Sequence, residues 1–377
     1  MRTIYDGNRA GAEAAKLARV EVVSAYPISP QTTIVEWLSQ FINDGLLNAK
    51  IIRVESEHSA LSAVAGASLC GARTFTASCS QGLQLMSEVL YFTSGMRLPV
   101  VMAVANRTLS MPVNIWCDHQ DSLVNRDSGW LQFYASSNQE VYDLIIQAYK
   151  ICEEILLPAM VCYDGFILSH SGEVVETVEQ EEVDKFLPKK ERITIDVKKP
   201  LQFGEVLYPE WYPDFEYKKH IALLNSKENI KVVGKEFEKI SGRGYGLIEE
   251  YRTDDADIIL LALGSIAGTA KVCVDELRKN GEKVGVIKII SFRPFPENEL
   301  KKACENASIV GVIDRDIGYG TCGMVYPDVV RVLRKKKTLN FIVGLGGKDV
   351  PLKTIEKCYS LAKEGKEEIY WPDLTVI

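Results

Sequence analysis

Residues 22–33, VVSAYPISPQTT, change abruptly from an apolar run to a polar segment with two prolines. The run Val22–Tyr26 has the pattern of a short buried strand. Pro30 lacks the N–H group that a strand ladder needs and suits the first turn of a helix. The stretch therefore predicts a strand, a tight loop and a helix in immediate succession. Ser29 places a hydroxyl group in that loop, which makes the loop a candidate binding site.

The same alternation continues on both sides of this stretch. Strands are expected at 21–26, 50–54, 73–77, 98–105 and 158–164, with helices near 8–18, 30–42, 57–71, 80–96 and 138–156. A second alternating unit follows, with strands at 257–263, 283–290, 308–314 and 339–343 and helices at 266–279, 296–306, 326–336 and 351–364. This pattern predicts an α/β protein with largely parallel sheets and helices on both faces.

Three parts of the chain are expected from these patterns. An α/β domain occupies 1–170, a connecting or wrapping segment occupies 171–249, and a second α/β domain occupies 250–377. The middle part contains a charged stretch, EQEEVDKFLPKKER, and an aromatic one, LYPEWYPDFEY, followed by an expected helix near 218–241. Such a composition favours a segment that covers a domain surface or a partner over an independent domain core.

Composition excludes several functional classes. With 377 residues and 46% hydrophobic content the chain can bury sizeable cores, and its net charge of −7 gives no signal for nucleic acid or an anionic membrane. No apolar stretch reaches the roughly 18 residues of a membrane span, and no signal peptide is recognisable, so a cytoplasmic protein is expected. The nine cysteines are scattered and form no C-x-x-C, which predicts no metal or iron–sulfur cluster held by this chain alone.

Three residues with chemically useful side chains follow three of the expected strands. Ser29 lies in the first loop, Glu57 follows strand 50–54, and Arg107 follows strand 98–105 at the start of a long loop that includes NIWCDHQDS. Ligands in open α/β sheets bind beyond the carboxyl ends of the strands, so these loops predict a shared site. The structural alternatives are an N-cap for Ser29, a helix cap for Glu57 and a salt bridge for Arg107.

Several motifs carry a resemblance to a known family. YPISP, ESEHSALSAVAGAS, GARTFTASCSQGL, NIWCDHQDS, FRPFP, DRD and GLGGKDV occur in this order. The chain resembles the α subunit of archaeal-type, multi-subunit pyruvate:ferredoxin oxidoreductases (pyruvate synthases), most weakly across 175–240. The resemblance implies a thiamine-diphosphate-fold, pyrimidine-type domain followed by a transketolase C-terminal-like domain. It also implies reversible conversion of pyruvate and coenzyme A to acetyl-CoA and CO₂ with ferredoxin as electron acceptor; a branched-chain or aryl 2-oxoacid is the alternative substrate.

The resemblance assigns roles to the three site candidates. In the family, a carboxylate at N1′ of the aminopyrimidine favours the imino tautomer, whose 4′-nitrogen takes the proton from the thiazolium C2, and Glu57 matches that carboxylate. Arg107 matches the arginine that holds the substrate carboxylate, a role suited to a planar, permanently charged fork. Ser29 stands where the family commonly has threonine, so the hydroxyl that contacts the substrate is kept without its methyl group. This departure leaves the substrate's size open.

Part of the expected active site is missing from the sequence. The metal-diphosphate motif of thiamine enzymes begins with GDG, and the nearest matches, Tyr5-Asp6-Gly7 and Tyr163-Asp164-Gly165, do not complete it. The resemblance therefore implies a β subunit that carries Mg²⁺, the diphosphate site and a 4Fe–4S cluster, so that thiamine diphosphate is shared between subunits. It further implies γ and δ (ferredoxin-like) subunits and ferredoxin as partners and coenzyme A as co-substrate, with no nucleic acid or membrane partner.

Two other functions compete with this interpretation. Residues 318–323, GYGTCG, form a G-x-G-x-x-G between an expected strand and helix, which would indicate a dinucleotide site in a dehydrogenase subunit. Asp314 and Asp316 lie next to the glycines and would repel a pyrophosphate, which disfavours this function. A non-catalytic scaffold is the other alternative, and the presence of all three site candidates disfavours it.

Overall fold

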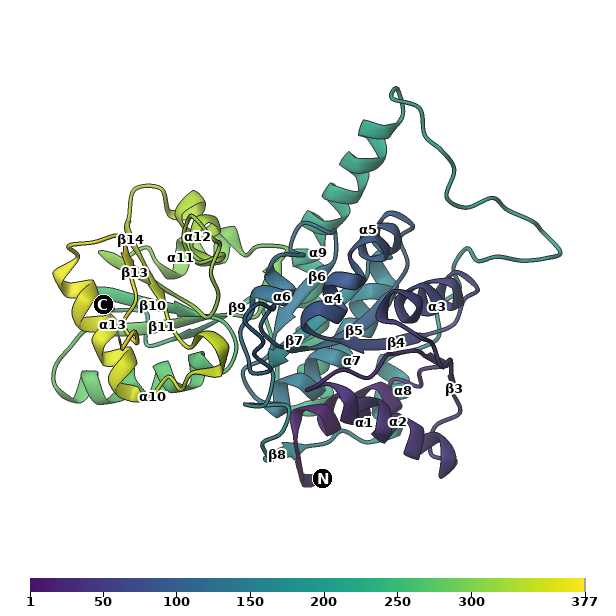
Figure 1. Cartoon of the computed structure of the whole chain (residues 1–377), viewed down its shortest axis with the longest axis horizontal. Helices are drawn as coiled ribbons and strands as arrows, with labels where there is room; N and C mark the ends of the chain where they lie inside the picture. The colour runs from purple at the N-terminus through teal and green to yellow at the C-terminus, as the bar shows by residue number, and fades with distance from the viewer. Residues whose placement is uncertain (376–377) are drawn as a thin grey trace.

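The computed structural model describes residues 1–375, which form two α/β units and a long projecting arm (Figure 1). A seven-stranded sheet lies at the centre of the first unit and a six-stranded sheet at the centre of the second. Each sheet is parallel except for one antiparallel edge strand: β12 (Ser291–Arg293) in the first and β9 (Ile248–Tyr251) in the second. This arrangement confirms the largely parallel α/β architecture predicted from the alternating sequence pattern.

The first sheet has the spatial order β12-β6-β7-β5-β4-β2-β3. Its other strands are β2 (Val22–Val23), β3 (Lys50–Ile51), β4 (Thr74–Ser78), β5 (Val100–Asn106), β6 (Leu131–Tyr134) and β7 (Ala159–Asp164). β4, β5 and β7 are buried along their whole length, which explains the apolar runs of β5 and β7, whereas β4 also buries the hydroxyl groups of Thr74, Thr76 and Ser78. β2 has β3 on one side and β4 on the other, so the chain continues in opposite directions across the sheet after β2 and after β4. Ligands of open α/β sheets bind at such a switch point.

Helices cover both faces of this sheet. On one face lie α1 (Gly7–Leu17), α2 (Thr32–Asn43) and α7 (Asn138–Ile155), and on the other lie α3 (Glu57–Leu69), α4 (Ser80–Leu85) and α5 (Ser87–Gly95). The single helix expected at 80–96 is interrupted at Met86, where no glycine or proline marks the break. The long loop expected after Arg107 contains a short helix, α6 (Gln120–Leu123), and ends in β6.

The second unit has the strand order β15-β14-β13-β10-β11-β9. Its strands include β10 (Ile258–Ala262), β11 (Val284–Ile289), β13 (Ile309–Asp314), β14 (Lys337–Ile342) and β15 (Ile369–Tyr370). Its helices are α10 (Ile266–Lys279), α11 (Glu297–Ala303), α12 (Tyr326–Leu333), α13 (Leu352–Glu364) and the one-turn η1 (Leu345–Gly347).

The two units share a strand and a hydrophobic core. β12 follows the second unit's β11 in the chain but pairs with β6 of the first sheet. Tyr134 of β6 packs edge-on against Phe292 of β12, with ring centroids 6.2 Å apart. The core cluster on this side runs from α3 and α5 through these rings to α11 and α12. Apolar burial of this extent favours a fixed arrangement of the two units.

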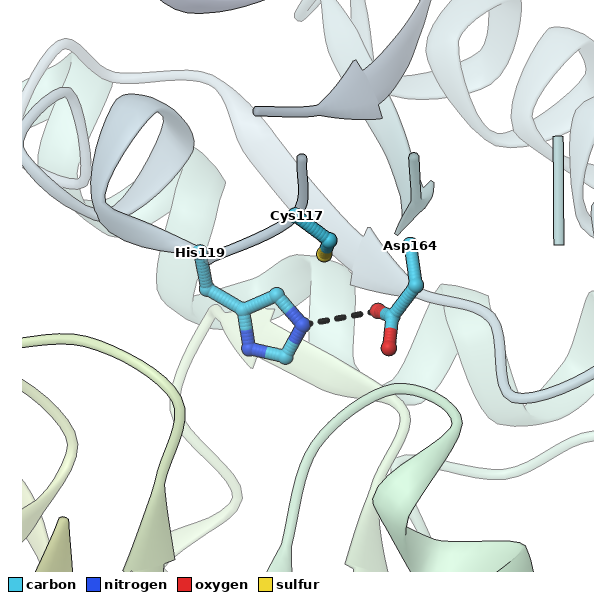
Figure 2. A group of neighbouring side chains, drawn as sticks. All are labelled: Cys117, His119 and Asp164. Carbon is cyan, nitrogen blue, oxygen red and sulfur yellow. Dashed lines mark hydrogen bonds and ion pairs between the residues drawn. The ribbon is translucent and has the colours of Figure 1, made fainter. Parts of the chain in front are cut away.

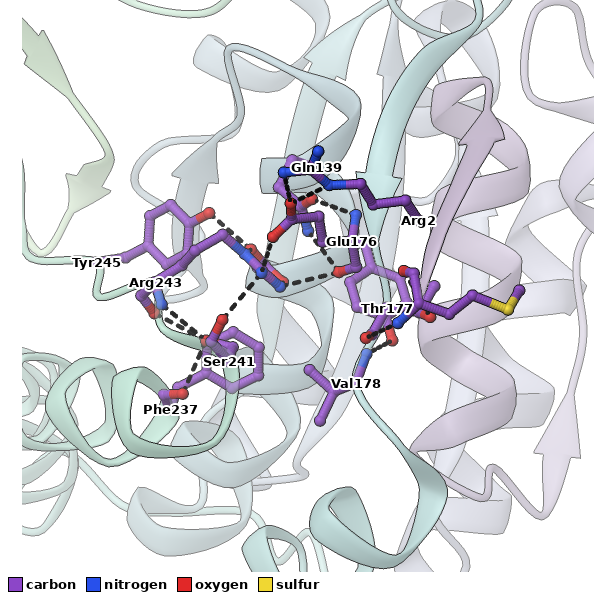
Figure 3. Close-up of polar contacts among 12 residues, drawn as sticks. Arg2, Gln139, Glu176, Thr177, Val178, Phe237, Ser241, Arg243 and Tyr245 are labelled. Carbon is purple, nitrogen blue, oxygen red and sulfur yellow. Dashed lines mark hydrogen bonds and ion pairs between the residues drawn. The ribbon is translucent and has the colours of Figure 1, made fainter.

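The segment between the units is anchored near the first unit. β1 (Arg2–Tyr5) and β8 (Glu173–Glu176) form a small antiparallel sheet, followed by α8 (Gln180–Phe186). Just beyond α9 (Tyr212–Ser241), Arg243 donates to the Glu176 backbone oxygen at 3.0 Å, and Arg2 donates to the Glu176 carboxylate at 2.7 Å (Figure 3). α9 begins earlier than the helix expected at 218–241.

Residues 188–195 still lie on the first unit, where Arg192 donates to the Ser68 backbone oxygen at 2.7 Å and the Ile195 N–H donates to the Leu69 oxygen at 3.1 Å. Residues 196–211 and the first half of α9 form the arm, which extends away from both units (Figure 1). Its large apolar side chains are exposed: Val197, Leu201, Val206, Tyr208, Trp211, Tyr212, Phe215 and Tyr217. An exposed apolar concentration of this kind usually marks an interaction surface. Within residues 1–375, no helix combines the length and the apolar character needed to cross a membrane.

Candidate functional site

The residues singled out from the sequence surround the switch point between β2 and β4. Ser29 lies in the loop after β2, Glu57 starts α3, and Arg107 follows β5 directly. Arg107 Nη1 donates to the Ser29 backbone oxygen at 2.9 Å, and the Cys79 thiol, between β4 and α4, donates to the same oxygen at 3.2 Å. Three strand ends therefore converge on one carbonyl group. Burial raises the pKa of Cys79, so this residue is a neutral thiol donor rather than a nucleophilic thiolate.

The N-cap alternative for Ser29 is wrong. α2 begins at Thr32, and Gln31 occupies the cap position without a side-chain cap bond. Gln31 instead donates its amide to the backbone oxygens of Tyr26 at 2.8 Å and Ala77 at 3.1 Å, which ties this loop to β4. Ser29 is exposed and contacts Arg107 through its backbone carbonyl, a contact that the sequence did not indicate.

Glu57 is a buried carboxylate, only 7% exposed, at the start of α3. The capping role belongs to Ser56, whose Oγ accepts from the Ser59 N–H at 3.2 Å. The Glu57 carboxylate packs on Gly82 of α4, where an added Cβ would lie 2.8 Å from the carboxylate carbon. Within the described part of the chain, no donor bonds to either carboxylate oxygen. Neither oxygen is among the fully enclosed polar atoms that lack a partner, so the carboxylate keeps an open side on which it can accept a hydrogen bond from a bound molecule.

The contacts of the Arg107 guanidinium are hydrogen bonds to backbone carbonyl groups. Besides the Ser29 carbonyl, its Nε lies 3.5 Å from the Asn114 backbone oxygen. No Asp or Glu among residues 1–375 forms an ion pair with its guanidinium, so the salt-bridge alternative has no support. A half-buried guanidinium fork without an acidic partner can bind the carboxylate of a ligand in a bidentate manner.

Asp121, to which the sequence analysis assigned no role, joins the loops after β4 and β5. Its Oδ2 accepts from the backbone N–H groups of Ser80 at 2.7 Å and Arg107 at 3.0 Å, and its Oδ1 accepts from the Asn106 amide at 2.7 Å. Burial raises the pKa of Asp121, although these hydrogen bonds favour the charged form. Ser80 has a φ of 50°, which is uncommon for a residue other than glycine, and Asp121 stabilises this turn beside Gly82.

Behind the site, Cys117, His119 and Asp164 form a buried polar group at the boundary of the two units (Figure 2). Their ligand atoms lie within 4.8 Å of one another, a spacing that a metal ion could use, and His119 Nε2 lies 2.8 Å from Asp164 Oδ1. Arg315 of the second unit is also buried there, 3.3 Å from Asp164 Oδ2. Burial opposes ionisation, but the neighbouring His119 and the Arg315 guanidinium hold the pKa of Asp164 well below its usual range. Because the guanidinium already balances the carboxylate, this group is an interdomain ion pair.

The glycine-rich loop at 318–323 does not form a pyrophosphate site. At the start of α12, the backbone N–H of Met324 donates to Asp316 at 2.6 Å and that of Val325 donates to Asp314 at 3.2 Å. Burial raises the pKa of Asp314 to about 6. The N–H groups that would bind a phosphate are already paired with side chains, so the dinucleotide interpretation is wrong.

Two family models match the chain in succession. The model described as "Pyruvate flavodoxin/ferredoxin oxidoreductase, thiamine diP-bdg" matches residues 13–235, which contain all three site candidates. The model described as "Pyruvate:ferredoxin oxidoreductase core domain II" matches residues 256–355 in the second unit.

Curated relatives are similar over almost the full length of the chain. Pyruvate synthase subunit PorA of Methanothermobacter thermautotrophicus is 46% identical, covering 98% of this chain and 97% of the relative. PorA of Pyrococcus abyssi is 47% identical, covering 98% and 95%. Ketoisovalerate oxidoreductase subunit VorA of Pyrococcus horikoshii is 43% identical, covering 98% of each chain.

A solved structure shares the fold. The 2-oxoglutarate:ferredoxin oxidoreductase from Magnetococcus marinus, with 2-oxoglutarate, coenzyme A and succinyl-CoA bound, superposes with a TM-score of 0.77 at 17% identity. The match covers 97% of this chain and 65% of that chain. At this level of identity the likeness shows the fold, and it confirms the predicted combination of a thiamine-enzyme domain with a second α/β domain.

Proposed function

Because the chain belongs to the pyruvate flavodoxin/ferredoxin oxidoreductase family, we propose that it is the α subunit of a thiamine-diphosphate-dependent pyruvate:ferredoxin oxidoreductase. Pyruvate and coenzyme A are converted reversibly to acetyl-CoA and CO₂, and the electrons pass to ferredoxin. Near-full-length similarity to pyruvate synthase subunits supports this assignment.

The observation that carries the proposal is that two charged side chains at one switch point lack a charged partner within the described part of the chain. Among residues 1–375, the buried Glu57 carboxylate has no hydrogen-bond donor and the Arg107 guanidinium has no carboxylate partner. Both charges also influence the pKa of the nearby Cys79 thiol, which Glu57 raises and Arg107 lowers. An aminopyrimidine and a 2-oxoacid would supply the missing donor and the missing carboxylate, so the residues present fit both molecules.

The residues then have distinct tasks. Thiamine diphosphate, when bound, supplies the carbon nucleophile that adds to the 2-oxoacid carbonyl. Glu57 accepts a hydrogen bond at N1′ of the aminopyrimidine and favours the tautomer able to take up a proton. Arg107 binds the substrate carboxylate and so orients the neighbouring carbonyl, while Ser29 lies beside the same substrate.

A branched-chain 2-oxoacid is the second candidate substrate. The relative named as a ketoisovalerate oxidoreductase subunit is 43% identical, only slightly less than the pyruvate synthase subunits. Ser29 also has less bulk than the threonine common in the YPITP motif, which leaves more room next to the substrate. A substrate panel on the assembled enzyme decides between the two acids.

We place the diphosphate site, Mg²⁺ and the 4Fe–4S clusters on partner subunits. Both GDG-like aspartates of this chain have structural tasks: Asp6 caps α1 by accepting from the Arg9 N–H at 2.7 Å, and Asp164 belongs to the interdomain ion pair. Within residues 1–375, the one cluster of potential ligands contains a single thiol, whereas a 4Fe–4S cluster needs four. A β subunit, the γ and δ subunits and ferredoxin are therefore the expected partners.

The first prediction tests this division between subunits. Expressed alone, the chain is expected to be folded and colourless, to hold no stoichiometric iron and to bind thiamine diphosphate weakly. Turnover of pyruvate is expected only after the partner subunits are added. Iron analysis, calorimetric titration with thiamine diphosphate and Mg²⁺, and ferredoxin reduction measure these properties. A brown preparation of the lone chain, or turnover without partners, would refute the shared site.

We also propose that the arm binds the subunit that carries the diphosphate half of the site. Within the arm, Gly204 lies next to Met96 at the end of α5, where an added Cβ would lie 3.6 Å from the sulfur. Tyr91 and Phe92 on α5 are exposed as well, and α5 follows α4, on which Glu57 packs. The exposed apolar surface thus extends from the arm toward the edge of the site that a partner must complete.

Trp211→Ala tests the arm. Aromatic residues dominate binding energy at interfaces, and the loss of one such residue commonly costs at least about 2 kcal/mol, which corresponds to roughly 30-fold in Kd. The Kd between this chain and the diphosphate-binding subunit is therefore expected to rise by at least that factor. Tyr319→Ala, which removes an exposed aromatic from the glycine-rich loop of the second unit, is the matched control. An unchanged Kd for both Trp211→Ala and Phe215→Ala would rule out the arm as this interface.

A further inference from the structure

We infer that the second unit positions Arg107, through a contact between Asn114 and the glycine turn Leu345–Gly347. This inference rests on the proposed function, in which Arg107 binds the substrate carboxylate. The turn belongs to the GLGGKDV motif, to which the proposed chemistry gives no role. Asn114 is a positioning residue in this arrangement, because it acts on the substrate only through Arg107.

Asn114 contacts both the glycine turn and Arg107. Its side-chain amide donates to the Gly346 backbone oxygen at 3.1 Å, across the boundary between the two units. Its backbone oxygen accepts from Thr108 Oγ1 at 2.6 Å and lies 3.5 Å from Arg107 Nε. The carbonyl that limits where the guanidinium can lie therefore belongs to a residue whose side chain is held by the second unit.

The turn also holds the rest of this loop. The Gly347 N–H donates to the Cys117 backbone oxygen at 2.7 Å. An added Cβ on Gly347 would lie 3.1 Å from the Trp116 ring carbon Cγ, and the residue has a φ of 76°, which favours glycine. Just before the turn, the Gly344 N–H donates to the Asp373 carboxylate at 2.8 Å, so the turn is anchored within the second unit. A rigid turn thus supports the loop that starts at Arg107.

The orientation of the Arg107 guanidinium depends on two carbonyl acceptors that lie on different loops. The other acceptor of Arg107 is the Ser29 carbonyl, on the opposite side of the site. If the Asn114 carbonyl moves, Arg107 keeps its charge but loses one of the two neutral acceptors that set its orientation. A bidentate carboxylate contact depends on the orientation of the fork, so substrate binding is expected to weaken while the chemistry on bound substrate continues.

Asn114→Ala in the assembled enzyme is the main test. The variant is expected to raise KM for pyruvate about 2- to 13-fold, the effect of one ordinary hydrogen bond, with kcat within about a factor of two of wild type. In an Arg107→Ala background the same substitution is expected to add nothing, because residues that act through one another are not additive. A normal KM for Asn114→Ala, or full additivity in the double variant, would overturn the inference.

Gly347→Ala tests the same support from the other side and remains decisive if Asn114→Ala does not fold. It is expected to raise KM for pyruvate at least as much as Asn114→Ala does, because its methyl group would displace Trp116. Gly281→Ala is the matched control: Gly281 has a φ of 83° and nothing within 4 Å of an added Cβ. This control carries the same backbone penalty and is expected to keep wild-type KM. A KM for Gly347→Ala no higher than that of Gly281→Ala would also overturn the inference.

The outcomes separate this inference from the proposed function. If Arg107→Ala itself leaves the kinetics unchanged, the substrate role of Arg107 fails. If Arg107→Ala is severe while Asn114→Ala and Gly347→Ala behave as wild type, only the positioning by the second unit fails.

Discussion

Replacement of Arg107 by alanine is expected to lower kcat/KM for pyruvate by roughly 30- to 5,000-fold in the assembled enzyme. Removal of one member of a desolvated, charge-assisted pair typically costs about 2–5 kcal/mol. The structure favours this range because no acidic side chain among the described residues pairs with the guanidinium, so the substrate carboxylate would be its first acidic partner. Arg107→Lys is expected to recover only part of the loss, since lysine offers a point charge without the fork.

Ser29→Ala provides the matched control for Arg107→Ala. It removes a hydroxyl but keeps the backbone carbonyl to which Arg107 donates, so the arginine stays in place. The loss of one neutral hydrogen bond costs about 0.5–1.5 kcal/mol, well below the cost expected for the arginine. The measurement is kcat/KM for pyruvate and for a branched 2-oxoacid, with variants of equal cluster content. Wild-type kinetics of Arg107→Ala with both acids would refute the substrate assignment, and a wild-type preference for the branched acid would change the substrate.

Local signals were sufficient for most of the fold. β5, β7 and α10 lie where buried apolar runs and helical periodicity placed them, because these elements depend on their own sequence and on burial. β6, which lies between the predicted long loop and the predicted helix at 138–156, was not predicted. It has only four residues, too few for a periodic pattern, and although it pairs with the predicted β7, its other partner β12 comes from much later in the chain.

The site could be predicted only in part, for a related reason. Glu57 and Arg107 follow strands whose carboxyl ends meet at one edge, and the motifs around them identify the family. The roles of Asp121 and Asn114 depend on loops that meet only in the folded chain: Asp121 joins the turns after β4 and β5, and Asn114 reaches the second unit. Nothing in the spacing of NIWCDHQDS reveals which of its polar residues faces which loop.

Glu57→Gln is expected to lower turnover of the assembled enzyme by about 10²–10⁴-fold, the usual contribution of a positioned proton-transfer group. The substitution keeps the shape of the side chain, and no donor or cation in the described part of the chain bonds to the Glu57 carboxylate. Folding, assembly and cluster content are therefore expected to remain normal, while the aminopyrimidine loses the carboxylate that favours its reactive tautomer. Single-turnover and steady-state rates at saturating pyruvate, with iron content as a check, measure the effect.

Ser56→Ala separates this catalytic role from a role in helix stability. Ser56 is the observed N-cap of α3, so its loss is expected to lower the free energy of unfolding by about 1 kcal/mol while activity per folded molecule stays normal. Glu57→Gln is expected to show the opposite pattern, with near-normal stability and very low turnover. If Glu57→Gln instead lost stability as Ser56→Ala does and kept more than about a tenth of wild-type turnover, the carboxylate would serve the helix rather than the cofactor. The two adjacent substitutions therefore decide whether the carboxylate at the start of α3 serves catalysis or helix stability.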